Sequence, residues 1–169
     1  MRHIMVATDG SEDADRAVDV AAELAKALGA RLFIVTVAGN LSGEETRELA
    51  RAEKNIGDAL EALSMQILTA AEKRAQRLGV TDIQLQLGWG DAAQSIMEIA
   101  AREAADAIVL GRRGRGRLAG LLLGSVSQKV ASLAPRIVII VPQLRKAPSR
   151  RRHSNAPEAC EPEAGPARD

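Results

Sequence analysis

Aromatic side chains are nearly absent from this chain of 169 residues, which has one Phe, one Trp and no Tyr. Proteins that bind single strands of nucleic acid draw about 1–3 kcal/mol per base from stacking on aromatic rings. An excess of positive charge is missing too, since 23 Lys and Arg stand against 22 Asp and Glu. Both deficits disfavour a nucleic-acid partner, and only local clusters of arginine keep that alternative open.

Cysteine is limited to Cys160, so the chain has neither an internal disulfide framework nor a cysteine-based metal cluster. A lone thiol fits a reducing compartment. No apolar run is long enough to cross a bilayer, and the first residues reach Asp9 before any run that would suit a signal peptide. We therefore expect a cytoplasmic protein with no membrane partner and no metal site.

Short aliphatic runs alternate with longer Ala- and Leu-rich segments, a pattern typical of βαβ units. The runs predict strands over residues 3–8, 31–37, 82–87, 106–111 and 136–141. Four of them are continuously apolar, as in strands covered on both faces. The third alternates apolar and polar residues, which predicts a half-exposed strand at an edge.

Apolar residues at a spacing of three to four predict the helices between these strands. The predicted helices cover residues 11–28, 44–79, 91–103 and 125–133. Gly29 and Gly79 are expected to end the first two, Gly57 is a candidate break in the second, and Pro135 limits the last.

The composition changes after Pro142, where Pro, Arg, Glu and Ala dominate and little can be buried. We expect one domain over residues 1–142 and a disordered, charged tail over residues 143–169. For the domain the pattern predicts an α/β fold of the Rossmann-like, doubly wound type. It has a five-stranded parallel sheet of order 3-2-1-4-5 with helices on both faces. Ligands of such sheets bind at the carboxyl ends of the strands where the order reverses, here at Asp9 and Gly111.

The stretch "GRRGRGRLAGLLLGS", residues 111–125, joins that carboxyl edge to the start of the last helix. A helix start offers unpaired N–H groups and the positive end of a dipole, and glycine lets main-chain amides approach an anion. We expect Gly124 and Ser125 to cap this helix. The chain contains no G-x-x-x-x-G-K-[ST] motif, and "GRGRLA" follows the fourth strand, so neither a P-loop nor a dinucleotide fingerprint is predicted.

The spacing of Gly111, Gly114, Gly124 and Ser125 closely resembles the G-x2-G-x9-G-[ST] signature of the universal stress protein family. The resemblance extends to "VATDGSEDADRAVDVAAELAKALGARLFIVTV" and covers residues 3–142. It implies a doubly wound sheet, a homodimer, and, because the signature is complete, membership of the subgroup that binds ATP. Bound ATP in turn allows for Mg²⁺ on its phosphates.

The resemblance places ribose on Asp9 and the adenine edge on main-chain groups of Val37. Gly111 would contact the sugar. The phosphates would be held by Gly114, Gly124, Ser125 and Val126, with Ser127 as a further contact. The full set of nucleotide-binding residues that it implies is Ala7, Thr8, Asp9, Val37, Leu110, Gly111, Gly114, Gly124, Ser125, Val126 and Ser127. The chemistry of the side chains agrees, since a carboxylate accepts from ribose hydroxyls and glycine amides suit phosphate.

These observations favour an ATP-binding protein with a regulatory role in a stress response, exerted through an unidentified protein partner. No general base and no catalytic residue is evident beside the expected phosphates, so we expect no enzyme, although slow hydrolysis stays open. The alternatives are a slow ATPase or nucleotide-using enzyme, and a nucleic-acid or scaffold protein acting through its arginines. The apolar run at residues 136–141 is expected to form a homodimer interface at the sheet edge.

Overall fold

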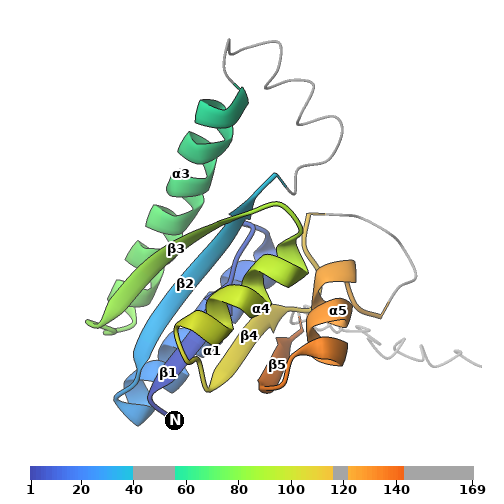
Figure 1. Cartoon of the computed structure of the whole chain (residues 1–169). Coiled ribbons are helices and arrows are strands. Elements are labelled where there is room, and N and C mark those ends of the chain that lie inside the picture. The colour runs from blue at the N-terminus through green and yellow to red at the C-terminus, as the bar shows by residue number, and fades with distance from the viewer. Residues whose placement is uncertain (40–55, 116–121, 143–169) are drawn as a thin grey trace, which may run out of the picture.

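Five parallel strands form the middle layer of the protein in the order β3-β2-β1-β4-β5 (Figure 1). The structure is a computed structural model that describes residues 1–39, 56–115 and 122–142. The predicted fold class and strand order are therefore confirmed. The strands are β1 (His3–Ala7), β2 (Arg31–Ala38), β3 (Ile83–Trp89), β4 (Ala107–Gly111) and β5 (Ile137–Val141).

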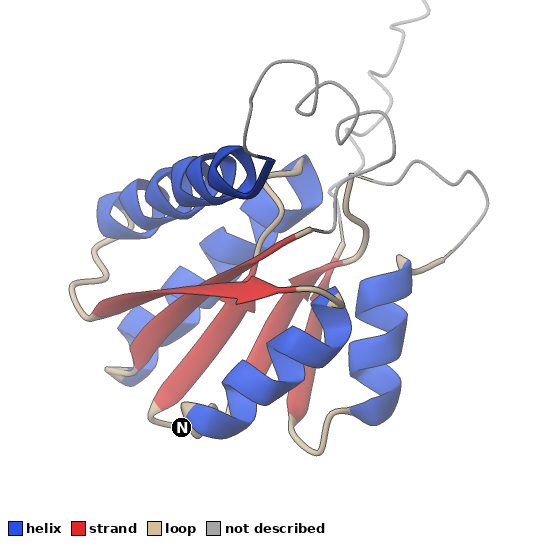
Figure 2. Cartoon of the chain, turned by 45° about the horizontal axis from the view of Figure 1, so that its top comes forward, coloured by secondary structure: helices blue, strands red, loops and turns tan. Residues whose placement is uncertain are grey.

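Helices cover both faces of this sheet (Figure 2). They are α1 (Glu12–Leu28), α3 (Ile56–Arg77), α4 (Ala92–Arg102) and α5 (Ser125–Leu133). Buried side chains of α1 and α3 share one core cluster with the sheet, and those of α4 and α5 share a second cluster on the opposite face. The order reverses at β1 and β4, which puts the carboxyl ends of these central strands between the two helical layers.

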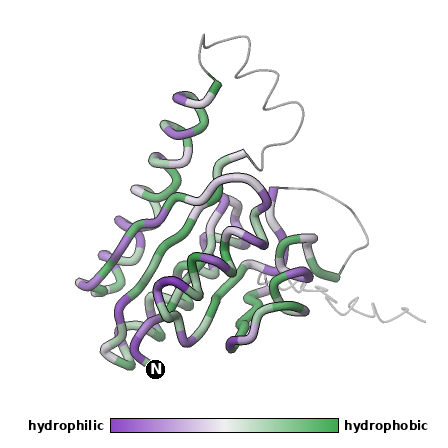
Figure 3. The backbone as a smooth tube through the Cα atoms, viewed as in Figure 1, coloured by the Kyte–Doolittle hydropathy of each residue, from purple (hydrophilic) through white to green (hydrophobic). Residues whose placement is uncertain are grey.

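The hydropathy of the chain explains this arrangement, because apolar residues are concentrated on the strands and on the inner faces of the helices (Figure 3). Ile4, Leu32 and Ile34 are fully buried, in keeping with strands covered on both sides. The inner face of α1 consists mainly of alanines, which bring the helix close to the sheet. At the edge, β3 keeps the predicted half-buried pattern.

The ends of the helices agree closely with the predicted ends. Ser11 caps α1 by accepting from the amide of Ala14, and Gly29 follows the helix with a left-handed φ of 59°. Gly79, with φ 92°, follows α3 in the same way. The described part of α3 runs through Gly57 without a break.

Two of the predicted segments lie outside the described residues: the first part of the second helix, residues 44–55, and the tail, residues 143–169. The division into a domain and a tail therefore stays a prediction. In the parts of the chain that the structure does describe, no helix combines the length and the apolar character that a membrane crossing needs.

Candidate functional site

The chain turns sharply after β1 and places Asp9 at the carboxyl edge of the sheet. The amide of Thr8 still donates to the carbonyl of Val35 at 2.8 Å, and the Thr8 hydroxyl accepts from the amide of Gly10 at 3.2 Å. Gly10 has a φ of 75°, which glycine adopts at no steric cost. Oδ1 of Asp9 accepts from the amide of Ser11 at 3.0 Å, so the carboxylate is oriented by the turn that starts α1.

The loop that follows β4 is held by hydrogen bonds from several elements. The carbonyl of Gly111 accepts from the Ser127 hydroxyl of α5 at 2.8 Å. Next to it, the amide of Arg112 donates to the carbonyl of Val141 in β5 at 2.8 Å, and the Arg112 carbonyl accepts from the amide of Gly124 at 2.9 Å. The described part of this loop is therefore a fixed structure, not a slack connection.

Two carboxylates beside the start of α1 bind amides of the same loop. Oδ2 of Asp13 accepts from the amide of Arg113 at 3.1 Å. Oδ2 of Asp9 accepts from the amide of Arg115 at 2.9 Å. Segments about a hundred residues apart in sequence are thus joined at the point where β1 and β4 end.

Three glycines of the signature differ in what their missing side chains allow. A Cβ on Gly111 would lie 2.7 Å from the main-chain carbon and oxygen of Asp13, so this glycine lets β4 pack against α1. A Cβ on Gly114 would collide with Oδ2 of Asp9. At Gly124 the nearest atom would be the Cα of Arg113 at 3.4 Å, and φ is −70°, which any residue adopts. Packing within the described protein does not require glycine at this position.

The start of α5 is the least protected helix start of those with a described cap. Gly124 is its N-cap and supplies no side-chain hydrogen bond, and the first turn has no acidic residue. In contrast, α1 and α4 are capped by the side chains of Ser11 and Asp91. The expectation that Ser125 also caps α5 is wrong, because Ser125 is the first helical residue and is exposed. Within the described residues, no N-cap side chain binds the first amides of α5, which leaves them to an external acceptor.

The remaining predicted residues line the apolar side of this edge. Leu110 is buried in the core cluster beneath α4 and α5, and Ala7, Val37 and Val126 are half-buried against the same cluster. Successive peptide groups of a strand point to opposite sides, so the carbonyl of Val37 points the same way as that of Val35, toward the β1 side. The last residue of β1, Ala7, pairs with Val35, so β1 has no residue opposite Val37.

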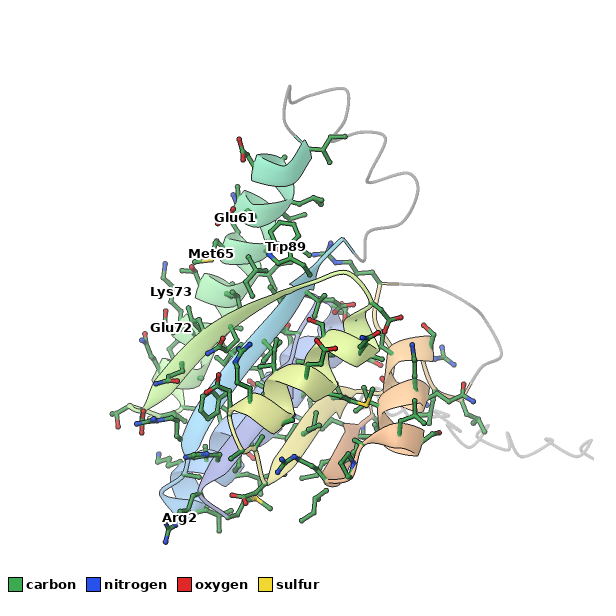
Figure 4. The ribbon with its side chains drawn as sticks, in the orientation of Figure 1. Arg2, Glu61, Met65, Glu72, Lys73 and Trp89 are labelled. Atoms are coloured by element: carbon green, nitrogen blue, oxygen red, sulfur yellow. The ribbon has the colours of Figure 1, made fainter. Side chains whose placement is uncertain are left out.

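Side chains of α3 and of the loop after β4 border the turn that follows β1. A side chain on Gly10 would meet a guanidinium nitrogen of Arg115 and Cγ1 of Ile67, both at 3.4 Å, so these two side chains border the turn after β1. Trp89, at the end of β3, lies beside α3 and is half exposed (Figure 4). His3 lies at the other end of β1, where its Nδ1 is 2.9 Å from the carbonyl oxygen of Glu103.

Asp91 and Lys129 form a further charged pair, between the start of α4 and α5. The side chain of Asp91 accepts from the amide of Gln94 at 2.8 Å and from Nζ of Lys129 at 3.1 Å. These hydrogen bonds, the first above all, hold the pKa of the Asp91 carboxyl below its ordinary value. Among the described residues, no three His, Cys, Asp or Glu side chains gather in a way that would hold a metal ion.

The sequence singled out Asp9 and the glycines, which the structure places at one edge, but not the contact of Asp13 with the loop. Asp13 was visible only as one of three acidic residues in the first turn of α1, a position that the helix dipole alone explains. Its partner, Arg113, is 100 residues away, and no local pattern connects the two. The arrangement as a whole offers main-chain donors, a carboxylate and an apolar wall at one edge.

The chain belongs to the universal stress protein family, because the model of that family matches residues 1–142. A universal stress protein of Thermus aquaticus is 37% identical over 147 residues, which cover 82% of this chain and 96% of the relative. One from Mycobacterium tuberculosis is 31% identical over 140 residues, with 82% and 94% covered. A crystal structure of a universal stress protein in complex with cAMP matches with a TM-score of 0.64 at 34% identity, covering 83% of this chain and 96% of that one.

Proposed function

We propose that this protein binds ATP at the carboxyl edge between β1 and β4 and acts as a nucleotide-dependent regulator. The observation that carries the proposal is the start of α5, whose first amides lack a side-chain cap and whose N-cap is a glycine that packing does not require. Uncapped amides at the positive end of a helix dipole attract phosphate. A Cβ on Gly124 would lie against the main chain of residues 112–114, and a polar side chain there would compete with phosphate oxygens for the first amides of the helix.

The other parts of a nucleotide have matching partners along the same edge. Asp9 is half-buried, and each carboxylate oxygen already accepts one main-chain hydrogen bond. Since a carboxylate offers about four acceptor positions, ribose hydroxyls can donate to those that remain. Adenine would lie against half-buried Ala7, Val37 and Val126, with its edge at the main chain of Val37. Leu110 and Thr8 support this wall from below.

The signature residues divide into two roles in this proposal. Gly111 and Gly114 allow the loop to lie against α1 and Asp9, which shapes the sugar end of the site. Gly124, Ser125 and Val126 supply main-chain donors to the phosphates. Ser127 is buried with its hydroxyl committed to the Gly111 carbonyl, so it would support the loop more than it contacts the ligand.

A nucleotide as the ligand class is supported by the relative that binds cAMP, since at 34% identity it is similar over most of this chain. The triphosphate is our extension from the complete glycine signature. Mg²⁺ would be held by ATP oxygens and water, because the described residues offer no cluster of acidic ligands.

We further propose that the nucleotide is held and not turned over. No described residue at the start of α5 has the character of a general base, and hydrolysis needs a group that orients water against the γ-phosphate. Regulation would then depend on a protein partner that distinguishes the bound from the empty form, because only a differential affinity can shift an equilibrium.

The test is to denature purified protein and identify the nucleotide released. Wild type should release adenine nucleotide, and Gly124→Asp should release none, because a carboxylate would meet the phosphates. Leu122→Asp is the matched control, since it adds the same charge two residues away at a side chain that is 84% exposed. Gly114 is left unchanged, because any side chain there collides with Asp9.

Three experimental results would contradict this proposal. Absence of ATP binding by folded, ligand-free wild type in calorimetry would remove the nucleotide site. Steady release of inorganic phosphate, abolished by Asp9→Ala, would make the protein an ATPase. Salt-sensitive binding of random oligonucleotides that persists in Gly124→Val would favour the alternative of a nucleic-acid protein.

We also propose a homodimer formed through β5. This strand is an edge of the sheet, and Ile137 at its start is 56% exposed. An apolar edge with unpaired main-chain groups favours pairing with a second chain. A regulatory protein that binds this dimer could then contact the surfaces beside both nucleotide sites.

A further inference from the structure

Asp13 makes two separate contacts with the loop that follows β4. Its Oδ2 accepts from the amide of Arg113 at 3.1 Å. Its main chain lies where a side chain of Gly111 would be, with the carbonyl carbon and oxygen both 2.7 Å from that Cβ position. The residue is only 8% exposed. A single residue of the first turn of α1 thus packs against the last residue of β4 and accepts a hydrogen bond from the chain two residues further on.

Asp9 and Asp13 bind the same loop but differ in access. They accept from the amides of Arg115 and Arg113, two residues apart in the loop. Asp9 is half-buried at the edge, where a ligand hydroxyl can reach it, whereas Asp13 is buried beneath the loop. The two carboxylates therefore differ in role: Asp9 can face a ligand, and Asp13 is shielded from it.

The loop segment fixed by Asp13 leads directly to the start of α5. Arg112, next to Arg113, accepts from the amide of Gly124 through its carbonyl at 2.9 Å. The Cα of Arg113 itself lies 3.4 Å from the position of a Cβ on Gly124. A shift of Arg113 would therefore move the main chain that lies beside Gly124, the N-cap of α5.

We propose that Asp13 is a positioning residue of the nucleotide site. It does not touch the ligand and acts through the amide of Arg113, which it holds so that Gly114 passes over Asp9 and the start of α5 stays open. This inference rests on the proposed function. Neither the glycine signature nor the helix pattern indicates Asp13 as a residue of the site. A site formed in advance binds more tightly, because the cost of ordering the loop is not taken from the binding energy.

The test compares ATP affinity, by calorimetry, in three variants. Asp13→Ala leaves the Arg113 amide without its buried acceptor, and we expect binding about tenfold weaker. Asp13→Asn should restore affinity to within about threefold of wild type, because the side-chain carbonyl of asparagine can still accept. Asp15→Ala is the matched control. It removes a carboxylate from the same turn, but one that faces Arg74 of α3 at 3.3 Å, and it should bind as wild type does.

A second measurement uses the ligand-free protein and does not depend on ATP. Amide hydrogen exchange at Arg113 should be slow in wild type and in Asp13→Asn, and fast in Asp13→Ala. Fast exchange of this amide in folded wild type would overturn the inference, even if Asp13→Ala did not fold. Equal ATP affinity in Asp13→Ala and wild type would overturn it too. A wild type with a slowly exchanging Arg113 amide but no ATP binding would instead remove the proposed function on which the inference rests.

Discussion

The main-chain amide of Arg115 donates to Oδ2 of Asp9 at 2.9 Å. This hydrogen bond places the loop after β4 directly over the carboxylate that is proposed to bind ribose. The close approach is possible only because the residue before Arg115 is Gly114, which has no side chain to meet Asp9. Asp9 thus has a structural role in addition to its proposed role toward a ligand.

The contact between Gly114 and Asp9 predicts an energetic coupling between the two. Gly114→Ala should lower the free energy of unfolding by about 1–3 kcal/mol, because its Cβ collides with the carboxylate. Asp9→Ala alone should cost about 1 kcal/mol through the lost hydrogen bonds. The double variant should lose less than the sum, since the colliding atom is gone.

Urea denaturation of the four proteins measures this cycle. Gly124→Ala serves as a comparison, because its Cβ would make only an ordinary contact. Additive losses in the double variant would mean that the loop does not lie on Asp9 in solution.

Gly124→Ser should separate stability from binding. Serine at an N-cap accepts from the amides of the first turn, which should stabilise the protein by a few tenths of a kcal/mol or leave it unchanged. The same hydroxyl would take the place of phosphate oxygens, so ATP should bind at least about tenfold more weakly. Thermal unfolding and calorimetry on one preparation measure both quantities. A variant that binds ATP as well as wild type would show that the N-cap of α5 is not the phosphate site.

The fold could be predicted from sequence because its determinants are local. Buried parallel strands need continuous apolar runs, and helices need a three-to-four repeat, so residues 31–37 and 11–28 were recognisable without a structure. Gly29 and Gly79 marked helix ends because the left-handed conformation that they adopt favours glycine.

The site could be predicted only in part, because its contacts are long-range. The spacing of the signature singled out three glycines but not the surroundings of each. Only the structure distinguishes Gly111, where a Cβ would collide with Asp13, from Gly124, where a Cβ would make ordinary contacts. The capping role given to Ser125 was wrong, since the helix begins one residue earlier than a serine cap requires. The pairing of Asp13 with Arg113 depends on how β4 approaches α1, which no pattern within either segment encodes.

The lowered pKa of Asp91 predicts a dependence of stability on pH. A folded-state pKa below that of the unfolded chain, about 3.9, means that the stabilisation is fully present above that value. It is lost as the pH falls through the folded-state pKa. Asp91→Asn keeps a side chain that can cap α4 but removes the charge that faces Lys129. It should be less stable than wild type at neutral pH and equal to it in strong acid. Urea midpoints measured across this range test the prediction, and a constant difference at every pH would contradict it.

Ile137 gives the sharpest test of the proposed dimer. Val138 and Ile140 pack against the core beneath α4 and α5, so a charge there would also disturb folding. Ile137 is 56% exposed at the open edge of the sheet, and a glutamate at this position would bring two like charges into an interface formed by β5. We expect Ile137→Glu to sediment as a monomer while wild type sediments as a dimer.

Leu28→Glu is the matched control for this experiment, since Leu28 is 52% exposed but lies at the end of α1, which is not on the sheet edge. It should sediment as wild type does and keep the wild-type unfolding midpoint, because its side chain is not in the core. Should Ile137→Glu remain dimeric, the two chains would have to meet at another surface. If β5 is the interface, dilution of wild type and the Ile137→Glu substitution should produce the same monomeric species, because both act on one set of contacts.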